Sequence, residues 1–405
     1  MAIIINQPYI EKIEGGKVRL CSKIEGDLND VLYYEVEDKY EQYLCDDRAD
    51  AFLVGLLHSA MFNGQDVVCR CGVSERLLFQ LNTYYISTVS DNMPDMANIH
   101  VQAEPLPELA GGKAVGTGNS GGVDSVYTLL KYSKEELGSL KLTHAIFNNI
   151  STNDVDETRI RTLFNRDVAG KRALVEELGL EFIPLYTNLY SFYRVPGIFN
   201  HYFALQYASA VYALKKLFGV FYFSSTFQVN MFSLDYKEIV SSARFDIFSL
   251  DCVSSEKLKF YSAGMEVDRM GKMEYIAPHP LTQKYLQVCA IEQSYGGYEI
   301  GDKLNCGFCH KCSRTIAIFY AWGILDQYEG IYDLTKFNAN RNKFIGRGLA
   351  ADQRTFAKMV KKLLRKSKRY TFMMDVWYVL YRIRYTLAKS GKLVALVHAL
   401  RGKGK

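Results

Sequence analysis

The residues with the clearest capacity for chemistry are six in a row, Ser120-Gly121-Gly122-Val123-Asp124-Ser125. They follow a β-like run, 113–118, and open a helix-like run, 123–132. Two glycines let backbone N–H groups approach a phosphate closely, and the N-terminus of the following helix favours negative charge. The two serine hydroxyls can donate to phosphate oxygens, and the aspartate can hold or orient Mg²⁺. This run therefore predicts a loop that binds the phosphates of a nucleotide.

A second run, Cys306-Gly307-Phe308-Cys309-His310-Lys311-Cys312, contains two successive C-x-x-C steps. Three thiols at that spacing suit one zinc ion, which takes four ligands in a tetrahedral site. The nearest upstream thiol is Cys289, with sixteen residues between it and Cys306, and a loop of that length closes at modest entropic cost. We expect Cys289, Cys306, Cys309 and Cys312 to bind Zn²⁺, with His279 and His310 as substitutes for the fourth ligand. The alternatives are an iron–sulfur cluster, a redox-active thiol pair and plain burial of the thiols.

Alternating strands and helices must position the first run. Strand-like runs at 143–149, 180–187 and 220–225 are separated by helix-like runs at 159–178 and 200–218. This order predicts right-handed βαβ units and a parallel sheet, in which ligands bind at the carboxyl ends of the strands. The six-residue loop and the polar residues that end the later strands are therefore expected to meet at one edge of the sheet.

The absence of a Lys after the glycines distinguishes the loop from the G-x-x-x-x-G-K-[ST] triphosphate loop. The loop resembles instead the S-G-G-x-D-S loop of the PP-loop ATP pyrophosphatases, the adenine nucleotide α-hydrolase superfamily. The resemblance covers about residues 113–323. It implies ATP and Mg²⁺ as cofactors, cleavage between the α- and β-phosphates, and an adenylated substrate. The cysteine spacing is similar to the zinc site of the 7-cyano-7-deazaguanine synthases, whose first spacing is shorter.

The resemblance also implies roles for individual residues. The end of the second strand would contact adenine and ribose, and the departing pyrophosphate needs a cation, for which Lys237, Arg244 and Lys284 are candidates. Asp235 is a weaker candidate for metal or substrate binding. The expected catalytic residues are Asp124, Ser125 and Lys237. The expected cofactor-binding residues are Gly118, Ser120, Gly121, Gly122, Val123, Asp124, Ser125, Phe147 and Asn148.

The fold class expected from these patterns is α/β, with a parallel-sheet, HUP-like (Rossmann-like) nucleotide-binding domain. An α+β module precedes it, and a helical region that is metal-binding and basic follows it. Pro105, Pro107 and Gly111-Gly112 mark a linker. The predicted domains are an N-terminal α+β module at 1–108, an ATP-binding domain at 109–284, a zinc-binding subdomain at 285–340 and a basic helical tail at 341–405.

Charge is distributed unevenly along the 405 residues. Residues 354–405 contain fifteen Lys or Arg and one acid, a formal charge of +14, whereas the whole chain carries only +5, so the preceding 353 residues carry −9. A basic helical tail favours RNA phosphates or anionic lipid as partners, or is a solvated surface. The sequence contains no apolar run long enough for a transmembrane helix and no signal-peptide pattern, which predicts a cytoplasmic protein with reduced thiols.

The function expected from the resemblance is that of an ATP-dependent adenylating enzyme of the ligase or amidotransferase type. It would activate a carboxylate, amide or carbonyl of a small-molecule acceptor for attack by ammonia or an amine. A tRNA-thiolating enzyme that binds RNA through its basic tail is the first alternative, and a non-catalytic, regulatory nucleotide-binding module is the second. A homodimer is left open.

Overall fold

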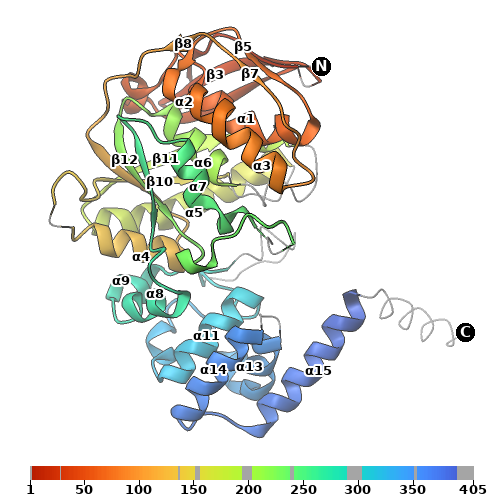
Figure 1. Ribbon diagram of the computed structural model, residues 1–405. Helices are drawn as coiled ribbons and strands as arrows, with labels where there is room; N and C mark the ends of the chain where they lie inside the picture. Colours follow the sequence, from red (N-terminus) through yellow and green to blue (C-terminus); the bar gives the residue numbers. More distant parts are fainter. Residues whose placement is uncertain are drawn as a thin grey trace, which may run out of the picture. The chain divides into compact units, whose positions relative to one another are not determined.

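The computed structural model describes residues 2–27, 29–135, 137–150, 156–193, 203–237, 241–289, 303–350 and 354–389. The chain forms two compact units, Met1–Pro278 and His279–Lys405, each of which is described by itself (Figure 1). The first unit holds a large mixed sheet that is mostly parallel. The second unit is helical and contains the cysteine cluster. No helix in the described part of the chain is both long and apolar enough to cross a membrane.

Half of the large sheet consists of five neighbouring parallel strands. In spatial order these are β13 (Lys259–Ala263), β12 (Phe218–Ser224), β9 (Ala114–Gly118), β10 (His144–Asn148) and β11 (Glu181–Thr187). Numbered by their appearance in the chain, they lie in the order 5-4-1-2-3, so the direction of winding reverses at β9. In open parallel sheets, the carboxyl end of the strand at such a reversal is where ligands bind.

The other half of the sheet comes from the N-terminal residues and is continuous with the first half. Strand β4 (Asp30–Glu37) pairs antiparallel with β11, through Tyr186 opposite Glu35 and Thr187 opposite Tyr34. Beyond β4 lie β3 (Lys17–Glu25), β1 (Ile3–Ile5), β5 (Val67–Cys69) and β7 (Val101–Gln102), and β2 (Tyr9–Ile13) pairs with β3. The two regions predicted as 1–108 and 109–284 therefore share one sheet.

Helices cover this sheet in two groups. Helix α4 (Val123–Tyr132) packs on β9 and β12, α5 (Glu157–Glu177) packs on β10 and β11, and α8 (Arg269–Ile276) packs on α4. The other group is α1 (Asp50–Asn63), α6 (Phe203–Ala213) and α7 (Asp246–Cys252), in which α6 contacts both α1 and α7. The first group matters most for function, because α4, α5 and α8 each carry a residue that reaches the loop after β9.

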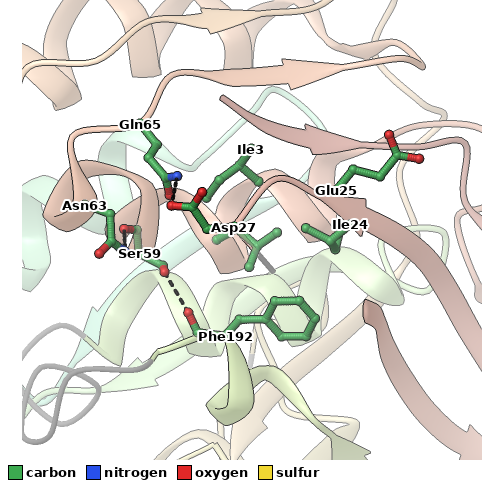
Figure 2. A pocket seen from close by; sticks show the side chains of 9 residues that line it. Ile3, Ile24, Glu25, Asp27, Ser59, Asn63, Gln65 and Phe192 are labelled. Atoms are coloured by element: carbon green, nitrogen blue, oxygen red, sulfur yellow. Dashed lines mark hydrogen bonds between the residues drawn. The ribbon is translucent and has the colours of Figure 1, made fainter. Parts of the chain in front are cut away.

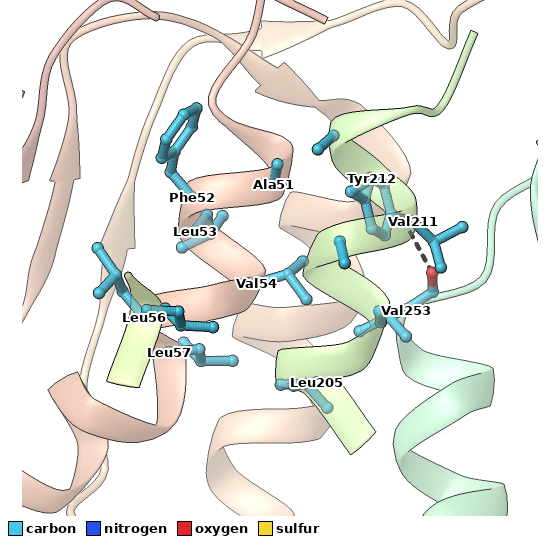
Figure 3. Packing of buried hydrophobic residues seen from close by; sticks show 14 of the residues in the cluster. Ala51, Phe52, Leu53, Val54, Leu56, Leu57, Leu205, Val211, Tyr212 and Val253 are labelled. Atoms are coloured by element: carbon cyan, nitrogen blue, oxygen red, sulfur yellow. Dashed lines mark hydrogen bonds between the residues drawn. The ribbon is translucent and has the colours of Figure 1, made fainter. Parts of the chain in front are cut away.

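Helix α1 is buried on all sides, from Asp50 to Met61, which is the pattern of a helix at the centre of a core. Figure 3 shows α1 beside α6, with Val54 pointing from α1 toward α6. Gly55 permits this packing, because a Cβ there would lie 2.7 Å from Tyr34 Oη and 3.2 Å from Ser209 Oγ.

The remaining elements of the first unit are short connections around this core. They are η1 (Asp38–Tyr43), β6 (Val73–Ser74), α2 (Glu75–Gln80), η2 (Leu81–Tyr85), α3 (Ile86–Asn92), β8 (Pro105–Leu106), η3 (Leu189–Phe192), η4 (Val229–Met231) and η5 (Ser242–Arg244). Strands β6 and β8 pair with each other in a separate two-stranded sheet.

The second unit is built on α11, α13 and the helices that follow. Its elements are α9 (Pro280–Tyr285), α11 (His310–Trp322), η6 (Leu325–Tyr328), α12 (Thr335–Ala339), α13 (Arg341–Ala350), α14 (Arg354–Lys366) and α15 (Phe372–Lys389). Two glycines let α13 pack closely between α11 and α15. A Cβ on Gly348 would lie 2.9 Å from Ser313 Cβ, and one on Gly346 would lie 2.5 Å from Trp377 Cβ.

Candidate functional site

The six-residue loop leaves the carboxyl end of β9 and is closed by hydrogen bonds within itself. Ser125 Oγ donates to the carbonyl of Gly118 (3.1 Å) and accepts from the N–H of Ser120 (3.1 Å). Asn119 Oδ1 accepts from the N–H of Gly121 (3.2 Å), and Ser120 Oγ accepts from that of Gly122 (3.3 Å). Ser125, predicted to donate to a phosphate, therefore holds the shape of the loop in this structure.

Backbone conformation explains the glycines of the loop. Gly121 has a φ of +75°, a left-handed conformation that costs an L-residue with a side chain roughly 1–2 kcal/mol. Gly122 occupies the N-cap position of α4 and has no side chain with which to cap it. The first N–H groups of a helix have no intrahelical partner and attract anions. Helix α4 therefore presents an uncapped N-terminus at the edge of the sheet.

Asp124 is held by two cations that both come from α8. Arg269 Nη2 donates to Asp124 Oδ2 (2.8 Å), and Lys272 Nζ donates to Asp124 Oδ1 (3.3 Å). Asp268 caps α8, because its Oδ1 accepts from the N–H of Gly271 (2.8 Å). The cap fixes the start of α8 and, with it, two positive charges beside the loop.

Lys272 is a buried ammonium, with 1% of its side chain exposed. Its Nζ also donates to the carbonyl of Ser225, which follows the carboxyl end of β12. Burial lowers the pKa of Lys272 from its usual value, and the charge of Asp124 opposes that shift. Gly264, just after β13, makes room for the chain, because a Cβ there would lie 2.9 Å from Lys272 Cε. The lysine thus links the ends of two strands to the loop.

A third cation reaches the loop from α5. Lys171 is 4% exposed, its Nζ donates to the carbonyl of Ser120 (2.6 Å), and its own carbonyl accepts from Asn119 Nδ2 (3.1 Å). Burial lowers the pKa of Lys171 to about 8. The sequence analysis missed Lys171, Arg269 and Lys272. A strand predicted at Lys259–Ala263 would have indicated that the helix after it, with Arg269 and Lys272, begins near the loop. The sequence of α5 does not distinguish Lys171 from its other basic residues.

The cations chosen from the sequence have other contacts. The described contacts of Lys237 are local: its N–H donates to Asp235 Oδ1 (2.9 Å), and its Nζ lies 5.8 Å from the Tyr236 ring. Arg244 Nη1 donates to the carbonyl of Met231 (2.9 Å). Lys284 belongs to α9 in the second unit, where its Nζ lies over the ring of Tyr285. Among the described residues, the hydrogen bonds and ring contacts of Lys237 and Arg244 involve no residue of the loop.

Phe147 and Asn148 end β10 at the same edge of the sheet. Ile146 is in register with Gly118, so both residues extend just past the end of β9. The ring of Phe147 stacks on that of Phe164 in α5 at 5.2 Å, and Asn148 Oδ1 accepts from the N–H of Ile150 (3.2 Å). The structure thus places these two predicted residues beside the loop.

The neighbouring Asn149 is buried and ties β10 to β11. Its Nδ2 donates to the carbonyl of Thr187 (2.8 Å), and its Oδ1 accepts from the N–H of the same residue (2.9 Å). This pair fixes the edge from which Phe147 and Asn148 project.

In the second unit, the four predicted cysteine sulfurs lie within 4.8 Å of one another. Cys306 Sγ is 3.8 Å from Cys312 Sγ, and Cys309 Sγ is 4.0 Å from Cys289 Sγ. Four sulfurs around one tetrahedral zinc would be about 3.8 Å apart, given Zn–S bonds of about 2.3 Å. The residues therefore fit a zinc ion. Neither His279 nor His310 belongs to this group of ligand atoms, which consists of thiols alone.

Local backbone features bring three of the thiols together. Gly307 has a φ of +75°, which turns the chain between Cys306 and Cys309. Cys306 Sγ accepts from the N–H of Cys309 (3.3 Å), and Cys309 Sγ, at the N-cap of α11, accepts from that of Cys312 (3.4 Å). Hydrogen bonds from the other three thiols, Cys289 first, lower the pKa of Cys309. A low pKa favours the thiolate, which is the form that binds metal.

Asn305 joins the fourth thiol to the others. Its buried Oδ1 accepts from the N–H groups of Val288 (2.8 Å) and Cys289 (3.1 Å), and its Nδ2 donates to the carbonyl of Leu286 (2.8 Å). One side chain next to Cys306 thereby holds the segment that carries Cys289. The sequence analysis did not single out this asparagine.

A small cavity of about 80 Å³ lies apart from both sites (Figure 2). Gln65 Nε2 donates to Asp27 Oδ2 (2.8 Å) at its wall, and Ser59 Oγ donates to the carbonyl of Phe192 (2.7 Å). None of its lining residues belongs to the loop, to α8 or to the cysteine group. The cavity is therefore separate from the residues of both candidate sites.

Comparison with known proteins found no family model, no curated protein and no solved structure that matches this chain.

Proposed function

We propose that the chain cleaves ATP between its α- and β-phosphates and transfers AMP to an acceptor. One observation carries the proposal: an uncapped, glycine-containing loop follows the strand at which the winding order reverses, and Lys171, Arg269 and Lys272 converge on it. The strand order 3-2-1-4-5 agrees with the first five strands of the Rossmann-type sheet, which binds nucleotides at the reversal of its winding order. Three cations beside a helix N-terminus suit a polyphosphate.

Each residue has a distinct task in this proposal. The N–H groups in the first turn of α4 bind phosphate oxygens, and Phe147 with Asn148 borders the nucleoside. Arg269 and Lys272 stabilise the charge that develops on the departing pyrophosphate. Asp124 positions these two cations, and Lys171 holds the carbonyl of Ser120 so that the loop keeps its shape.

The proposed reaction would also use Mg²⁺ as a companion of the phosphates. The carboxylate of the loop, Asp124, is paired with two cations, so most ligands of the ion would be phosphate oxygens and water, as is common for Mg²⁺. The ion would supply further charge neutralisation at the phosphates. Asp124 would orient the ion, whereas Arg269 and Lys272 would act on the phosphates.

The proposed reaction has two steps. An oxygen of the acceptor, from a carboxylate, amide or carbonyl, attacks the α-phosphorus, and the bond from that phosphorus to the bridging oxygen of the β-phosphate breaks. Pyrophosphate leaves with the electron pair. Ammonia or an amine then attacks the activated carbon, and AMP departs. The site's contribution is positioning and electrostatic stabilisation.

The cysteine group is proposed to bind zinc as a structural ion. Four protein thiols complete the tetrahedral shell, so no position is left for a substrate or a water. Cys289, Cys306, Cys309 and Cys312 would hold the ion, and its effect would be to join the 286–289 segment to the start of α11.

The proposal is tested by incubating the protein with ATP, Mg²⁺ and fractions of a cell extract. We expect one fraction to support release of pyrophosphate and formation of an AMP adduct detected by mass spectrometry. Asp124→Ala should abolish both, whereas Lys259→Met, at an exposed ion pair with Asp251, should change neither. Release of orthophosphate by wild-type protein, or wild-type pyrophosphate release by Asp124→Ala, would refute the mechanism. Tight ATP binding without release in any fraction would favour a regulatory module.

A further inference from the structure

Helix α15 has an apolar face that no other described residue of its unit covers. Phe372, Val379 and Ile383, at spacings of seven and four residues, lie on one side of the helix. They are 75%, 51% and 52% exposed, and Met373 and Leu380 beside them are 46% and 50% exposed. This is a contiguous stripe rather than a scattered set, and an exposed apolar stripe of that kind marks an interaction surface.

The opposite side of α15 is the one that packs on the protein. Met374 is buried, and a Cβ built on Gly346 of α13 would lie 2.5 Å from Trp377 Cβ. Helix α13 packs in turn on α11, so α15 forms an outer layer of the second unit (Figure 1). Helix α15 therefore contacts α13 through one face and exposes the apolar stripe on a different face.

A strongly basic helix lies next to α15. Helix α14 buries Ala357, Val360 and Leu364, and exposes Lys358, Lys362, Arg365 and Lys366. It is joined to α15 by Lys361, whose Nζ lies 2.6 Å from Asp375 Oδ1 and 3.7 Å from the centre of the Tyr378 ring.

Residues 354–389 contain eleven Lys or Arg and a single acid, a formal net charge of +10. Because Lys361 pairs with that acid, no other acidic side chain in this segment offsets the remaining cations.

We propose that α14 and α15 form a docking surface for an anionic lipid bilayer. Positive charge draws the helices to acidic headgroups, and the apolar stripe then enters the boundary between headgroups and acyl chains, as in interfacial amphipathic helices. Exposed aliphatic side chains such as Val379, Leu380 and Ile383 contribute nothing to RNA binding, which uses charge and flat aromatic rings. A second copy would bring two surfaces of the same charge together.

Vesicle sedimentation with the full chain tests this surface. We expect binding to phosphatidylcholine vesicles that contain about 30% phosphatidylglycerol, at least about tenfold tighter than to phosphatidylcholine alone, and weakened in about 0.5 M NaCl. Leu380→Gln with Ile383→Gln should weaken binding by about tenfold or more through the lost apolar contact. Lys358→Glu with Lys362→Glu should have a similar effect through charge.

Matched controls lie in the first unit. Leu137→Gln replaces another exposed apolar residue, at 62% exposure, and Lys12→Glu with Lys23→Glu changes the net charge by the same amount as the α14 variant. Neither control should alter binding. Every variant, including the α14 charge variant, is assessed for folding by thermal melting, and melting temperatures equal to that of the wild type are expected.

Three results would overturn the proposal. The first is equal or absent binding to the two vesicle types. The second is tight binding of a short RNA, unaffected by the apolar substitutions, together with no binding to vesicles. The third is a dimer in sedimentation that dissociates in the Leu380→Gln, Ile383→Gln variant, which would assign the stripe to a second copy of this chain. Loss of vesicle binding leaves pyrophosphate release untouched, so this test is independent of the proposed reaction.

Discussion

The phosphate loop of the first unit and the cysteine centre of the second are both built on a short run of residues, yet they are completed in different ways. At the cysteine centre, three of the four ligands lie within seven residues, and a glycine turn and a helix N-cap bring them together. At the loop, the short run provides backbone and one carboxylate. The charges that make it a candidate polyphosphate site come from α5 and α8, which are distant in sequence.

This difference has a physical origin. Metal ligands are soft, specific side chains whose spacing is tied to local backbone geometry, so the spacing can be recognised in a sequence. A phosphate site needs positive charge, and lysine and arginine are common on every surface. Only the packing of α5 and α8 against the loop selects Lys171, Arg269 and Lys272 from the other cations.

The strongest test of the local site is Cys309→Ser. We expect about one zinc per chain in the wild type and loss of that zinc in the variant, with a large decrease in melting temperature of the second unit, because binding of structural zinc contributes on the order of 10 kcal/mol to folding. Elemental analysis and calorimetry measure both effects. Cys252→Ser, at a buried thiol outside the group, should keep its metal. Well-folded wild-type protein without metal would rule the site out.

The strongest test of the assembled site is Lys272→Met. Removal of a buried cation from the pyrophosphate should lower the rate of pyrophosphate release by about 10²–10³-fold, the range found for single groups that stabilise developing charge. The methionine retains most of the volume, so folding should be kept. A rate within twofold of the wild type, in the presence of an active extract fraction, would show that the charge from α8 has no part in the reaction.

Asn305→Leu tests whether the cysteine centre is as local as its spacing indicates. The variant removes the hydrogen bonds that hold the N–H groups of Val288 and Cys289, and loss of hydrogen bonds that orient a metal ligand weakens metal affinity by about 10–100-fold. Competition with a zinc chelator measures the change. Unaltered affinity would mean that the three clustered thiols orient Cys289 without help.

The smallest expected effect is a pH dependence that arises at Lys171. Its pKa is about 8 in the folded protein and higher in the unfolded chain, so above pH 8 the unfolded chain binds more protons. The free energy of unfolding should therefore gain a contribution that increases from about pH 8 to about pH 10. Lys171→Met should lack this increase, and the difference between the two denaturation profiles isolates it. Parallel profiles would show that Lys171 titrates normally.

The sequence alone predicted much of this molecule. Alternation of strands and helices predicted four of the five strands in the parallel half of the sheet and missed β13, and the glycine run at the end of β9 marked the loop. The four cysteines were also named correctly as one group. Local rules sufficed in each case: periodicity, turn chemistry and ligand spacing.

Tertiary structure decided what those rules do not contain. It joined the N-terminal strands to the parallel sheet through β4 and β11, where the sequence suggested a separate module. It placed Lys171, Arg269 and Lys272 at the loop, and among the described residues it left one apolar face of α15 exposed. Each of these depends on contacts between residues far apart in the chain. Helical and strand periodicity show which side of an element is apolar, but only packing determines what lies against it.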